Sequence, residues 1–483
     1  MLSNCQNCGN PIAPHERVCS YCGLAVQAGQ SQPLNQHNPS PVPPPPGPAP
    51  LSQTGPFPSP GSVIHQHFAT LRGLLRQYPV VGRYGPLSFL SRMHCPFCDF
   101  AFHPGDCAIY WEDEQRQLIL KEQVPQTELE RLFARLRSKR LDQGAYFRHN
   151  AQRACPRCQS LLPSSFESYP TFTIAVIGNT VSGKSLFITA LLHLLNERIM
   201  AEQGEVTVDF QPLNEKTKRT LEQNDDTLFK EKKPLDITRE ADGYRIVSPR
   251  QKQGTYIQWE PLIFRLKIGY KEPGKNFRDN LLNLVFYDMS GELQVTDRSL
   301  RTAWPLSHAQ GIILVADPLS MPGILPYLGQ GIEVQAARSM ATARRVKPDQ
   351  ILSQIAYARV AIAGGNQQKP VSTPVAIMLS KSDLLDGFAR KRGFPASFAK
   401  NPVYTGNVHV DEINQISDEV VQLLQEAGEV QLLAESKRYA QVKFFATSAT
   451  GHALGQDGTY PKVEPRRCLD PLLWLLWELT GKQ

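Results

Sequence analysis

Apolar and polar positions follow a distinctive order in the middle of the chain, from Thr171 to Leu195. Phe172 to Ile177 is short, apolar and rich in β-branched side chains, which predicts a buried strand. A glycine-bounded loop follows. Apolar side chains then recur at helical spacing, at Leu186, Phe187, Ala190, Leu191, Leu194 and Leu195. The pattern therefore predicts a strand, a tight loop and a helix in immediate succession.

Five later apolar runs predict further strands. Trp259–Ile268 and Leu281–Tyr287 flank a turn rich in glycine, proline and lysine, so we expect them to form a long hairpin. The runs Gly311–Ala316, Pro374–Leu379 and Lys443–Ala446 are separated by helical segments. Strands that alternate with helices in this way predict an α/β fold with a doubly wound sheet.

The loop after the first strand fits the phosphate-binding pattern G-x-x-x-x-G-K-[ST] in full. Its glycines let backbone N–H groups turn toward an anion, and the start of the following helix adds a partial positive charge. Lys184 can reach the β- and γ-phosphates of a nucleotide, and the Ser185 hydroxyl can ligate Mg²⁺. The predicted loop residues are Gly178, Asn179, Thr180, Val181, Ser182, Gly183, Lys184 and Ser185.

Polar motifs also follow the later strands. Asp288-Met-Ser-Gly291 ends the hairpin, Ser380-Lys-Ser-Asp383 follows the Pro374–Leu379 run, and Thr447-Ser-Ala449 follows the last run. An acidic residue at the position of Asp288 suits the Mg²⁺ side of a nucleotide site, and Gly291 allows a backbone N–H to approach the γ-phosphate.

In this order the motifs resemble those of the P-loop GTPases, which carry a phosphate loop, D-x-x-G, [N/T]-K-x-D and S-A. The resemblance implies GTP or GDP as ligand and Mg²⁺ as cofactor. Asp383 would accept hydrogen bonds from guanine, and Lys381 would lie along the base. Ser448 and Ala449 would form the last base-facing loop, with the Ala449 N–H toward guanine O6.

This sequence departs from the family pattern in the bracing and catalytic positions. Ser380 replaces the usual Asn or Thr, which predicts the loss of a loop-bracing hydrogen bond. Glu292 stands where many members carry the glutamine that orients the attacking water. The switch threonine, which senses Mg²⁺ in this family, is either Thr255 or Thr238, and the spacing favours Thr255. We therefore assign catalytic roles to Lys184, Glu292 and Thr255, and expect hydrolysis to be slow or partner-dependent.

Eight of the ten cysteines form four C-x-x-C pairs. Two thiolate pairs make a tetrahedral site that suits Zn²⁺. The first predicted zinc ligands are Cys5, Cys8, Cys19 and Cys22, at zinc-ribbon spacing, and the second are Cys95, Cys98, Cys155 and Cys158. The second set is more widely spaced, and the stretch between its pairs suggests an inserted folded piece. Thr127-Glu-Leu-Glu130 there predicts a helix start with a capping box.

The whole layout resembles the prokaryotic double-GTPase-like group, whose members also carry cysteine pairs just before the P-loop strand. We divide the chain into a zinc ribbon (1–28), a proline-rich linker (29–62), a four-cysteine module with a helical insertion (63–168) and a GTPase-like domain (169–483). The linker favours extended polyproline structure and predicts a spacer, with recognition by a partner as the alternative. The zinc modules or the linker are the expected contacts for a protein partner.

Charge and hydropathy argue against two classes of protein, those that bind nucleic acids and those that span membranes. The net charge of +7 is spread evenly, which gives nucleic-acid binding little support. No apolar run approaches the roughly 20 residues of a membrane span, and the first residues lack a signal-peptide core, so we expect a cytoplasmic protein. The sequence thus predicts a GTP-hydrolysing switch, and leaves open a non-hydrolysing nucleotide-binding scaffold or an ATPase.

Overall fold

The computed structural model divides the chain into two units, Met1–Val63 and Ile64–Gln483. In the first unit the structure describes two short paired strands, β1 (Ser3–Asn4) and β2 (Pro11–Ile12). In the second unit it describes residues 92–113, 117–132, 134, 151–163, 166–179, 181–197, 206–235, 244–247, 256–270, 278–290, 304–329, 331, 334–335, 346–363, 369–402 and 409–480.

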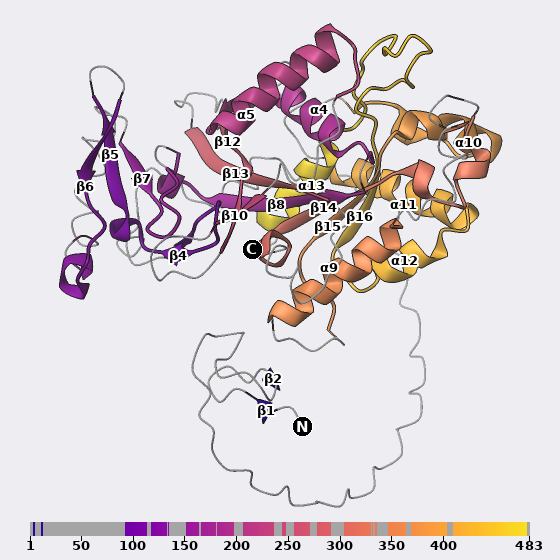
Figure 1. Ribbon diagram of the computed structural model, residues 1–483. Helices are drawn as coiled ribbons and strands as arrows, with labels where there is room; N and C mark the ends of the chain where they lie inside the picture. Colours follow the sequence, from indigo (N-terminus) through magenta and orange to yellow (C-terminus); the bar gives the residue numbers. More distant parts are fainter. Residues whose placement is uncertain are drawn as a thin grey trace, which may run out of the picture. The chain divides into compact units, whose positions relative to one another are not determined.

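A seven-stranded sheet runs through the second unit (Figure 1). Its strands are β8 (Thr171–Gly178), β9 (Val206–Pro212), β12 (Leu262–Tyr270), β13 (Arg278–Ser290), β14 (Gly311–Ala316), β15 (Val375–Leu379) and β16 (Val442–Ala446). They lie in the order β16-β15-β14-β8-β13-β12-β9. The strands from β16 to β13 are parallel, and β12 is antiparallel to both of its neighbours.

The parallel strands follow one of the doubly wound orders. Numbered along the chain, they lie as 2-1-3-4-5, so the strand order reverses between β8 and β14. In such sheets ligands bind outside the carboxyl ends of the strands at the point of reversal. For this chain that point is the end of β8, where the glycine-bounded loop begins.

Helices cover both faces of the sheet (Figure 1). Their bounds are α4 (Lys184–Asn196), α5 (Glu215–Arg219), α7 (Trp304–His308), α9 (Pro348–Ala363), α10 (Asp386–Lys391), α11 (Val410–Glu426), α12 (Val430–Ser436) and α13 (Asp470–Thr480). Side chains of α4 and α13 pack in one apolar cluster, and those of α9 and α12 pack in the other. Two π-helical turns, η4 (Thr220–Asn224) and η5 (Asp226–Lys230), continue α5.

Strand β8 contributes to both clusters because its side chains alternate between the two faces. Ile174 and Val176 belong to the cluster under α4, whereas Ala175 and Ile177 belong to the opposite one. All four side chains are buried. The continuous apolar run therefore reflects a strand that is covered on both faces.

The predicted mixed α/β architecture with a mostly parallel sheet is confirmed. The expected hairpin is the antiparallel pair β12–β13, in which Leu262 faces Phe286. Trp259, which the sequence assigned to that hairpin, belongs instead to a separate two-stranded pair, β10 (Tyr244–Val247) and β11 (Tyr256–Trp259). Neither this pair nor β9 was predicted from the sequence.

The stretch between the two later cysteine pairs contains strands as well as helix. Its elements are β3 (Met93–His94), β4 (Ala101–Phe102), β5 (Ala108–Glu112), β6 (Leu118–Glu122) and β7 (Gln152–Ala154), the last three forming a sheet in the order β6-β5-β7. The capping box is present, because the Glu130 N–H donates to Thr127 Oγ1 and the Thr127 N–H donates to a Glu130 carboxylate oxygen. In the described part, the predicted helical insertion is therefore mainly an antiparallel sheet.

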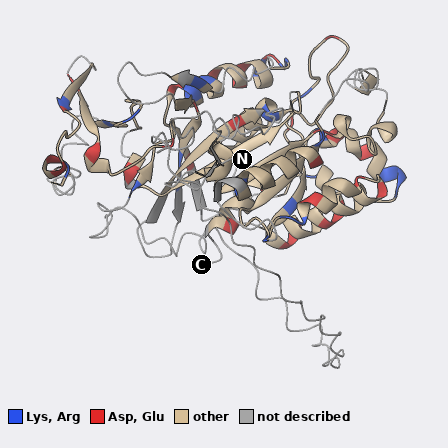
Figure 2. Cartoon of the chain, turned by 60° about the horizontal axis from the view of Figure 1, so that its bottom comes forward, with Lys and Arg blue, Asp and Glu red and all other residues tan. Residues whose placement is uncertain are grey.

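Charged side chains of both signs are distributed over the described elements, with no stripe of one sign in the view of Figure 2. Within the described ranges, the helices are too short or too polar to cross a bilayer.

Candidate functional site

The loop that joins β8 to α4 has two positions at which the structure requires glycine. Gly183, just before the helix, has φ of +89°. A Cβ at Gly178 would lie 2.5 Å from the carbonyl oxygen of Val315 on the adjacent β14. Both glycines of the predicted phosphate loop are thus required by the structure, one by its dihedral angle and one by close packing.

Lys184 lies over the loop that precedes it. Its Nζ donates 2.8 Å hydrogen bonds to the carbonyl oxygens of Gly178 and Asn179. The loop also holds polar atoms that are buried without a hydrogen-bond partner among the described residues, namely Asn179 Oδ1 and Ser182 Oγ. A cation, a helix start and a buried hydroxyl, that of Ser182, therefore meet at one strand end, as expected of an anion site; the Asn179 amide oxygen is an acceptor and does not add to it.

Ser380 braces the phosphate loop from the end of β15. Its hydroxyl donates a 2.7 Å hydrogen bond to the Ser182 carbonyl oxygen, and its backbone N–H donates to Ala316 at 3.0 Å. The sequence predicted that a bracing bond would be lost at this position, and that prediction is wrong for the bond to Ser182. A short hydroxyl suffices because the two loops approach closely; a Cβ at Gly183 would lie 3.9 Å from Ser380 Cβ.

Lys381 links the same loop to β14. Its Nζ lies 3.2 Å from Asp317 Oδ2 and 3.4 Å from the Val181 carbonyl oxygen. Asp317 directly follows β14, is 3% exposed, and also accepts the Leu319 N–H at 3.0 Å through Oδ1. No role was predicted for Asp317 from the sequence; its position directly after the apolar run Gly311–Ala316 was the available signal.

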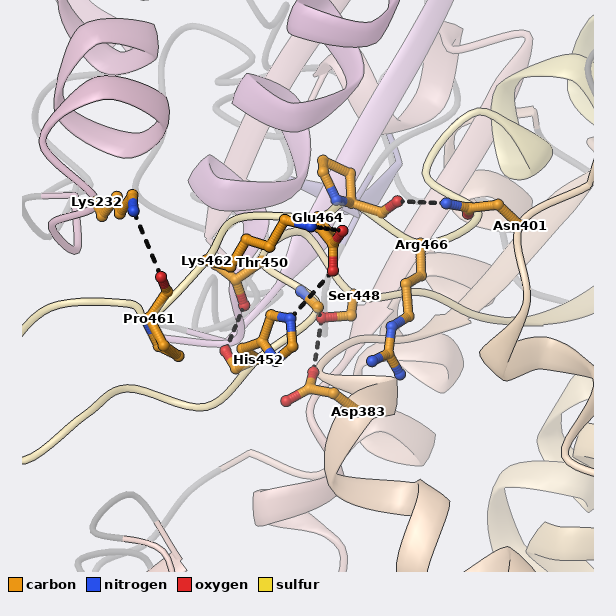
Figure 3. A network of polar contacts seen from close by, with 12 residues as sticks. Lys232, Asp383, Asn401, Ser448, Thr450, His452, Pro461, Lys462, Glu464 and Arg466 are labelled. Atoms are coloured by element: carbon orange, nitrogen blue, oxygen red, sulfur yellow. Dashed lines mark hydrogen bonds and ion pairs between the residues drawn. The ribbon is translucent and has the colours of Figure 1, made fainter.

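Asp383 and Ser448 come from neighbouring strand ends and contact one another (Figure 3). The Ser448 hydroxyl donates a 2.6 Å hydrogen bond to Asp383 Oδ1. Asp383 lies in the 3₁₀ turn Ser382–Leu385, and the next helix, α10, has Leu385 at its N-cap with no side-chain capping bond. Asp383 is therefore not the N-cap residue of α10. Ala449 is half-buried in the same loop as Ser448.

A later segment of the chain, which includes Gly451 and Arg466, holds Ser448 and the start of α10 in place. Ser448 and Arg466 exchange backbone hydrogen bonds of 3.1 and 2.7 Å. The Arg466 guanidinium lies 2.9 Å from Asp386, which begins α10. The Ser448 oxygen that donates to Asp383 also accepts the Gly451 N–H at 2.8 Å. These contacts fix both sides of the Asp383–Ser448 bond, and no sequence motif indicated Arg466.

Asp288 lies in β13, next to β8, where it pairs in register with Val176. Burial raises the pKa of its carboxyl group, and the positive charges of Lys184 and Lys216 oppose that rise. An acidic side chain thus lies within electrostatic reach of the phosphate-loop lysine. Ser185, in the first turn of α4, is half-buried. Divalent Mg²⁺ prefers carboxylate and hydroxyl oxygens of this kind.

Several predicted site residues lie outside the described part of the chain. They are Thr180, Thr238, Thr255, Gly291, Glu292 and the first cysteine set, Cys5, Cys8, Cys19 and Cys22. Their assignments remain predictions from the sequence.

The second cysteine set converges. The sulfur atoms of Cys95, Cys98, Cys155 and Cys158 all lie within 4.8 Å of one another. The Cys95–Cys158 and Cys98–Cys155 sulfur pairs are both 3.7 Å apart. Four sulfurs placed tetrahedrally about 2.3 Å from a zinc ion would be separated by about 3.8 Å. The donor set and its spacing therefore fit one tetrahedral metal ion.

Each C-x-x-C pair forms the same backbone turn. The Cys95 N–H donates to Phe100 at 3.0 Å and the Asp99 N–H donates to the Cys95 carbonyl oxygen at 2.9 Å; Cys155, Gln159 and Ser160 repeat the pattern at the same distances. Asp99 and Gln159 both have positive φ, 59° and 57°. We call these two turns the knuckles, 95–100 and 155–160.

Other nearby residues that could bind a metal stay outside the cluster. Cys107 is 3% exposed, and burial raises the pKa of its thiol. His94 and His308 both contact the Asp99 carboxylate, at 3.0 and 3.1 Å, and their rings are 5.9 Å apart. Among the described residues, the metal-type group comprises the four cysteines alone.

The knuckles belong to the apolar core of the sheet. Cys95, Cys98 and Cys155 lie in the same buried cluster as Ile177 of β8 and Tyr287 of β13. The Tyr287 hydroxyl donates a 2.6 Å hydrogen bond to the Pro96 carbonyl oxygen in the first knuckle. The four-cysteine cluster is therefore packed onto the sheet.

No protein-family model matches the chain. A curated protein of Mycolicibacterium smegmatis, named "Putative ESX-1 scaffolding and assembly protein SaeC", is 24% identical over 340 residues, which cover 66% of this chain and 78% of that protein. Two solved structures of sup35, one complexed with GDP and one with GMPPNP, are each 12% identical with a TM-score of 0.21. They cover 62% and 58% of this chain, but the match spans only 44% and 38% of the sup35 chains. A TM-score of 0.21 is too low to assign a function to this chain from sup35.

Proposed function

We propose that this chain is a Mg²⁺-dependent, GTP-binding and GTP-hydrolysing switch whose four-cysteine cluster holds Zn²⁺. The observation that carries the proposal is the grouping of three loops and the strand residue Asp288 at one edge of the sheet. The phosphate loop, Asp288, the Ser380–Asp383 turn and the Ser448 loop all lie at the carboxyl ends of parallel strands. In a doubly wound sheet that edge is where ligands bind.

The phosphate side of the site is suited to an anion. Lys184 supplies a positive charge, and the glycine-bounded loop leads directly into the start of α4, whose first backbone N–H groups have no partner within the helix. Ser182 Oγ is buried and has no partner among the described residues, so a phosphate oxygen or an ordered water would satisfy it. Ser185 and Asp288 would hold Mg²⁺, which neutralises phosphate charge during transfer.

The base side is suited to guanine. Asp383 presents a carboxylate at the sheet edge, with one oxygen held by Ser448. Guanine offers a carboxylate two adjacent N–H donors, whereas adenine would place its N1 lone pair against the negative charge. Leaving a charge unpaired costs more than losing a neutral hydrogen bond, so the preference for guanine is expected to be large.

The hydrolytic step depends on residues predicted from the sequence alone. Glu292 would orient or activate the attacking water, and Thr255 would contact Mg²⁺ in the triphosphate state. Lys184 would stabilise charge on the transferred phosphoryl group. Because Glu292 replaces the usual glutamine, we expect slow turnover without a partner.

A zinc ion bound by the four later cysteines would be structural. All four protein ligands are thiolates, which leaves no open coordination position for chemistry. The first cysteine set would hold a second zinc ion, and that module, with the proline-rich linker, would contact a protein partner.

A non-hydrolysing scaffold is the second candidate. The observation that favours it is the name of the M. smegmatis relative, which refers to scaffolding and assembly. Purified protein incubated with GTP or ATP, each with and without Mg²⁺, separates the candidates. Tight GTP binding with Mg²⁺-dependent release of phosphate supports the switch; binding without turnover supports the scaffold. A preference for ATP would refute the guanine assignment.

A further inference from the structure

The end of β13, which carries Asp288, extends past the neighbouring strand β12. The two strands pair as far as Leu262 opposite Phe286. The residue before Leu262 is Pro261, which has no backbone N–H with which to extend the ladder. Among the described strands, the last residues of β13, 287–290, pair with β8 alone. The strand end that bears Asp288 therefore lacks the support of β12.

The Tyr287 hydroxyl attaches this strand end to the first knuckle. It donates a 2.6 Å hydrogen bond to the Pro96 carbonyl oxygen. The side chain is 2% exposed, and its ring meets those of Trp259 and Trp304 edge-on, with ring centroids 6.0 and 5.3 Å apart. Buried packing on the ring and a short bond on the hydroxyl thus fix Tyr287 where the β12 ladder has ended.

The first knuckle is itself held by other parts of the fold. Two backbone hydrogen bonds close its turn. The Trp259 N–H of β11 donates a 2.7 Å hydrogen bond to the Phe97 carbonyl oxygen, and the Asp99 carboxylate lies 3.1 Å from His308 of α7. The Pro96 carbonyl is therefore a fixed point that does not depend on β13 for its position.

Tyr287 and Asp288 project from opposite faces of the sheet, because neighbouring residues of a strand alternate. Tyr287 packs in the apolar cluster that contains the knuckles, whereas Phe286, on the face of Asp288, packs in the cluster under α4. A bond on one face thus fixes the backbone from which the Asp288 carboxylate projects on the other. Mg²⁺ demands near-ideal octahedral geometry, so its ligands tolerate little displacement.

We propose that Tyr287 is a positioning residue for Asp288. By bonding to the Pro96 carbonyl, it holds the end of β13 where Asp288 can bind Mg²⁺, and the four-cysteine module serves the nucleotide site as an anchor. This inference rests on the proposed Mg²⁺–nucleotide site. It does not require the cysteines to hold a metal, because the hydrogen bond joins a hydroxyl to a backbone carbonyl.

Two conservative variants separate this role from a loss of stability. Tyr287→Phe removes the hydroxyl and keeps the ring. Tyr439→Phe is the matched control, because the Tyr439 hydroxyl also donates a 2.6 Å bond to a carbonyl oxygen, that of Leu352. Tyr439 is 5% exposed and belongs to the same apolar cluster, but it precedes β16, which three strands separate from β13. Each variant loses one buried hydrogen bond.

The test compares nucleotide affinity with and without Mg²⁺. The full chain is titrated with a fluorescent GTP analogue in Mg²⁺ and in Mg²⁺-free buffer without chelator, so that any metal at the cysteines is kept. The factor by which Mg²⁺ tightens binding should be about 2- to 12-fold smaller in Tyr287→Phe, the size expected for one buried hydrogen bond. Affinity without Mg²⁺ should be unchanged, and Tyr439→Phe should match the parent in both buffers.

The outcomes distinguish this inference from the proposed function. If Mg²⁺ tightens binding to Tyr287→Phe as much as to the parent, the inference fails alone. Equal weakening with and without Mg²⁺ would also overturn it, since Tyr287 would then support binding only through the fold. A Tyr287→Phe variant that does not fold, where Tyr439→Phe does by circular dichroism, would lead to the same conclusion. If Mg²⁺ has no effect on the parent, the proposed Mg²⁺ site fails and this inference fails with it.

Discussion

The Ser448 hydroxyl donates a 2.6 Å hydrogen bond to Oδ1 of Asp383, joining two loops that are 65 residues apart in the sequence. The bond fixes one oxygen of the carboxylate at the edge of the sheet. Asp383 is not the N-cap of the next helix, because α10 begins at Asp386 with Leu385 at its N-cap. Base recognition by Asp383 is our proposal, and the hydrogen bond from Ser448 supports it by holding one carboxylate oxygen in place.

We predict that Asp383→Asn weakens GTP binding by about 1.5–3 kcal/mol, roughly 10- to 150-fold, because charge-assisted hydrogen bonds to guanine are lost. Xanthine nucleotides should bind better, since their extra carbonyl accepts from the new amide. Competition binding with GTP, XTP and ATP measures both changes. Asp226→Asn, an exposed aspartate paired with Lys230, should leave all three affinities unchanged. Full guanine preference in the Asp383 variant would reject the base assignment.

We predict that Lys184→Ala abolishes nucleotide binding without unfolding the protein. Lys184 supplies a positive charge at the phosphate loop, and its Nζ donates to the carbonyl oxygens of Gly178 and Asn179. Fluorescent-nucleotide titration measures the loss, and thermal melting checks the fold. Lys233→Ala removes an exposed lysine paired with Glu231 and should bind normally. Unchanged affinity in the Lys184 variant would show that the loop is not the site.

We predict that Ser380→Ala weakens nucleotide binding by about 0.5–1.5 kcal/mol, or roughly 2- to 12-fold, because the phosphate loop loses the hydrogen bond to the Ser182 carbonyl. Ser380→Thr retains a hydroxyl and should bind within about twofold of the parent. Isothermal titration with GTP and Mg²⁺ compares the two. Equal affinity for the Ala and Thr variants would mean that the brace has no role in binding.

We predict that Cys95→Ser or zinc chelation lowers the free energy of unfolding of the sheet unit by more than about 2 kcal/mol, because these cysteines share the apolar core with β8 and β13. Cys5→Ser lies in the separate unit Met1–Val63 and should leave that transition in place. Denaturant melts followed by circular dichroism test this. An unchanged midpoint after chelation would show that the cluster does not stabilise the sheet.

We predict that Glu429→Gln stabilises the protein at neutral pH. Burial raises the pKa of Glu429 above 4.5, against a 2.7 Å hydrogen bond from the Gly323 N–H. The ionised form is therefore disfavoured in the folded state, and stability is lost as pH rises through the folded pKa. Glutamine keeps the acceptor for Gly323 without the charge.

Melting temperatures measured at about pH 4 and pH 7 check the sign for Glu429. The gain should be present at pH 7 and should shrink toward pH 4, where the carboxyl group is increasingly protonated in both states. A variant that is less stable at pH 7 would contradict the prediction.

The sequence by itself determined the strands of the parallel sheet and the order of the loops after them. Continuous apolar runs such as Gly311–Ala316 identify strands buried on both faces, and β14 has those bounds. Gly178, Gly183 and Lys184 were also predictable, because the phosphate-loop pattern fixes local backbone geometry. Such features depend on residues close together in the chain.

Only the tertiary structure decided the contacts between distant segments. Nothing in the local pattern indicated that Ser448 bonds to Asp383, that Ser380 reaches Ser182, or that Gln258 reaches Ser160. A hydrogen bond requires its two atoms within about 3 Å, and for distant residues that separation is set by sheet order and packing. The convergence of Cys95, Cys98, Cys155 and Cys158 was predicted from the paired C-x-x-C motifs, but the place of the cluster in the core depends on how the chain packs against β13.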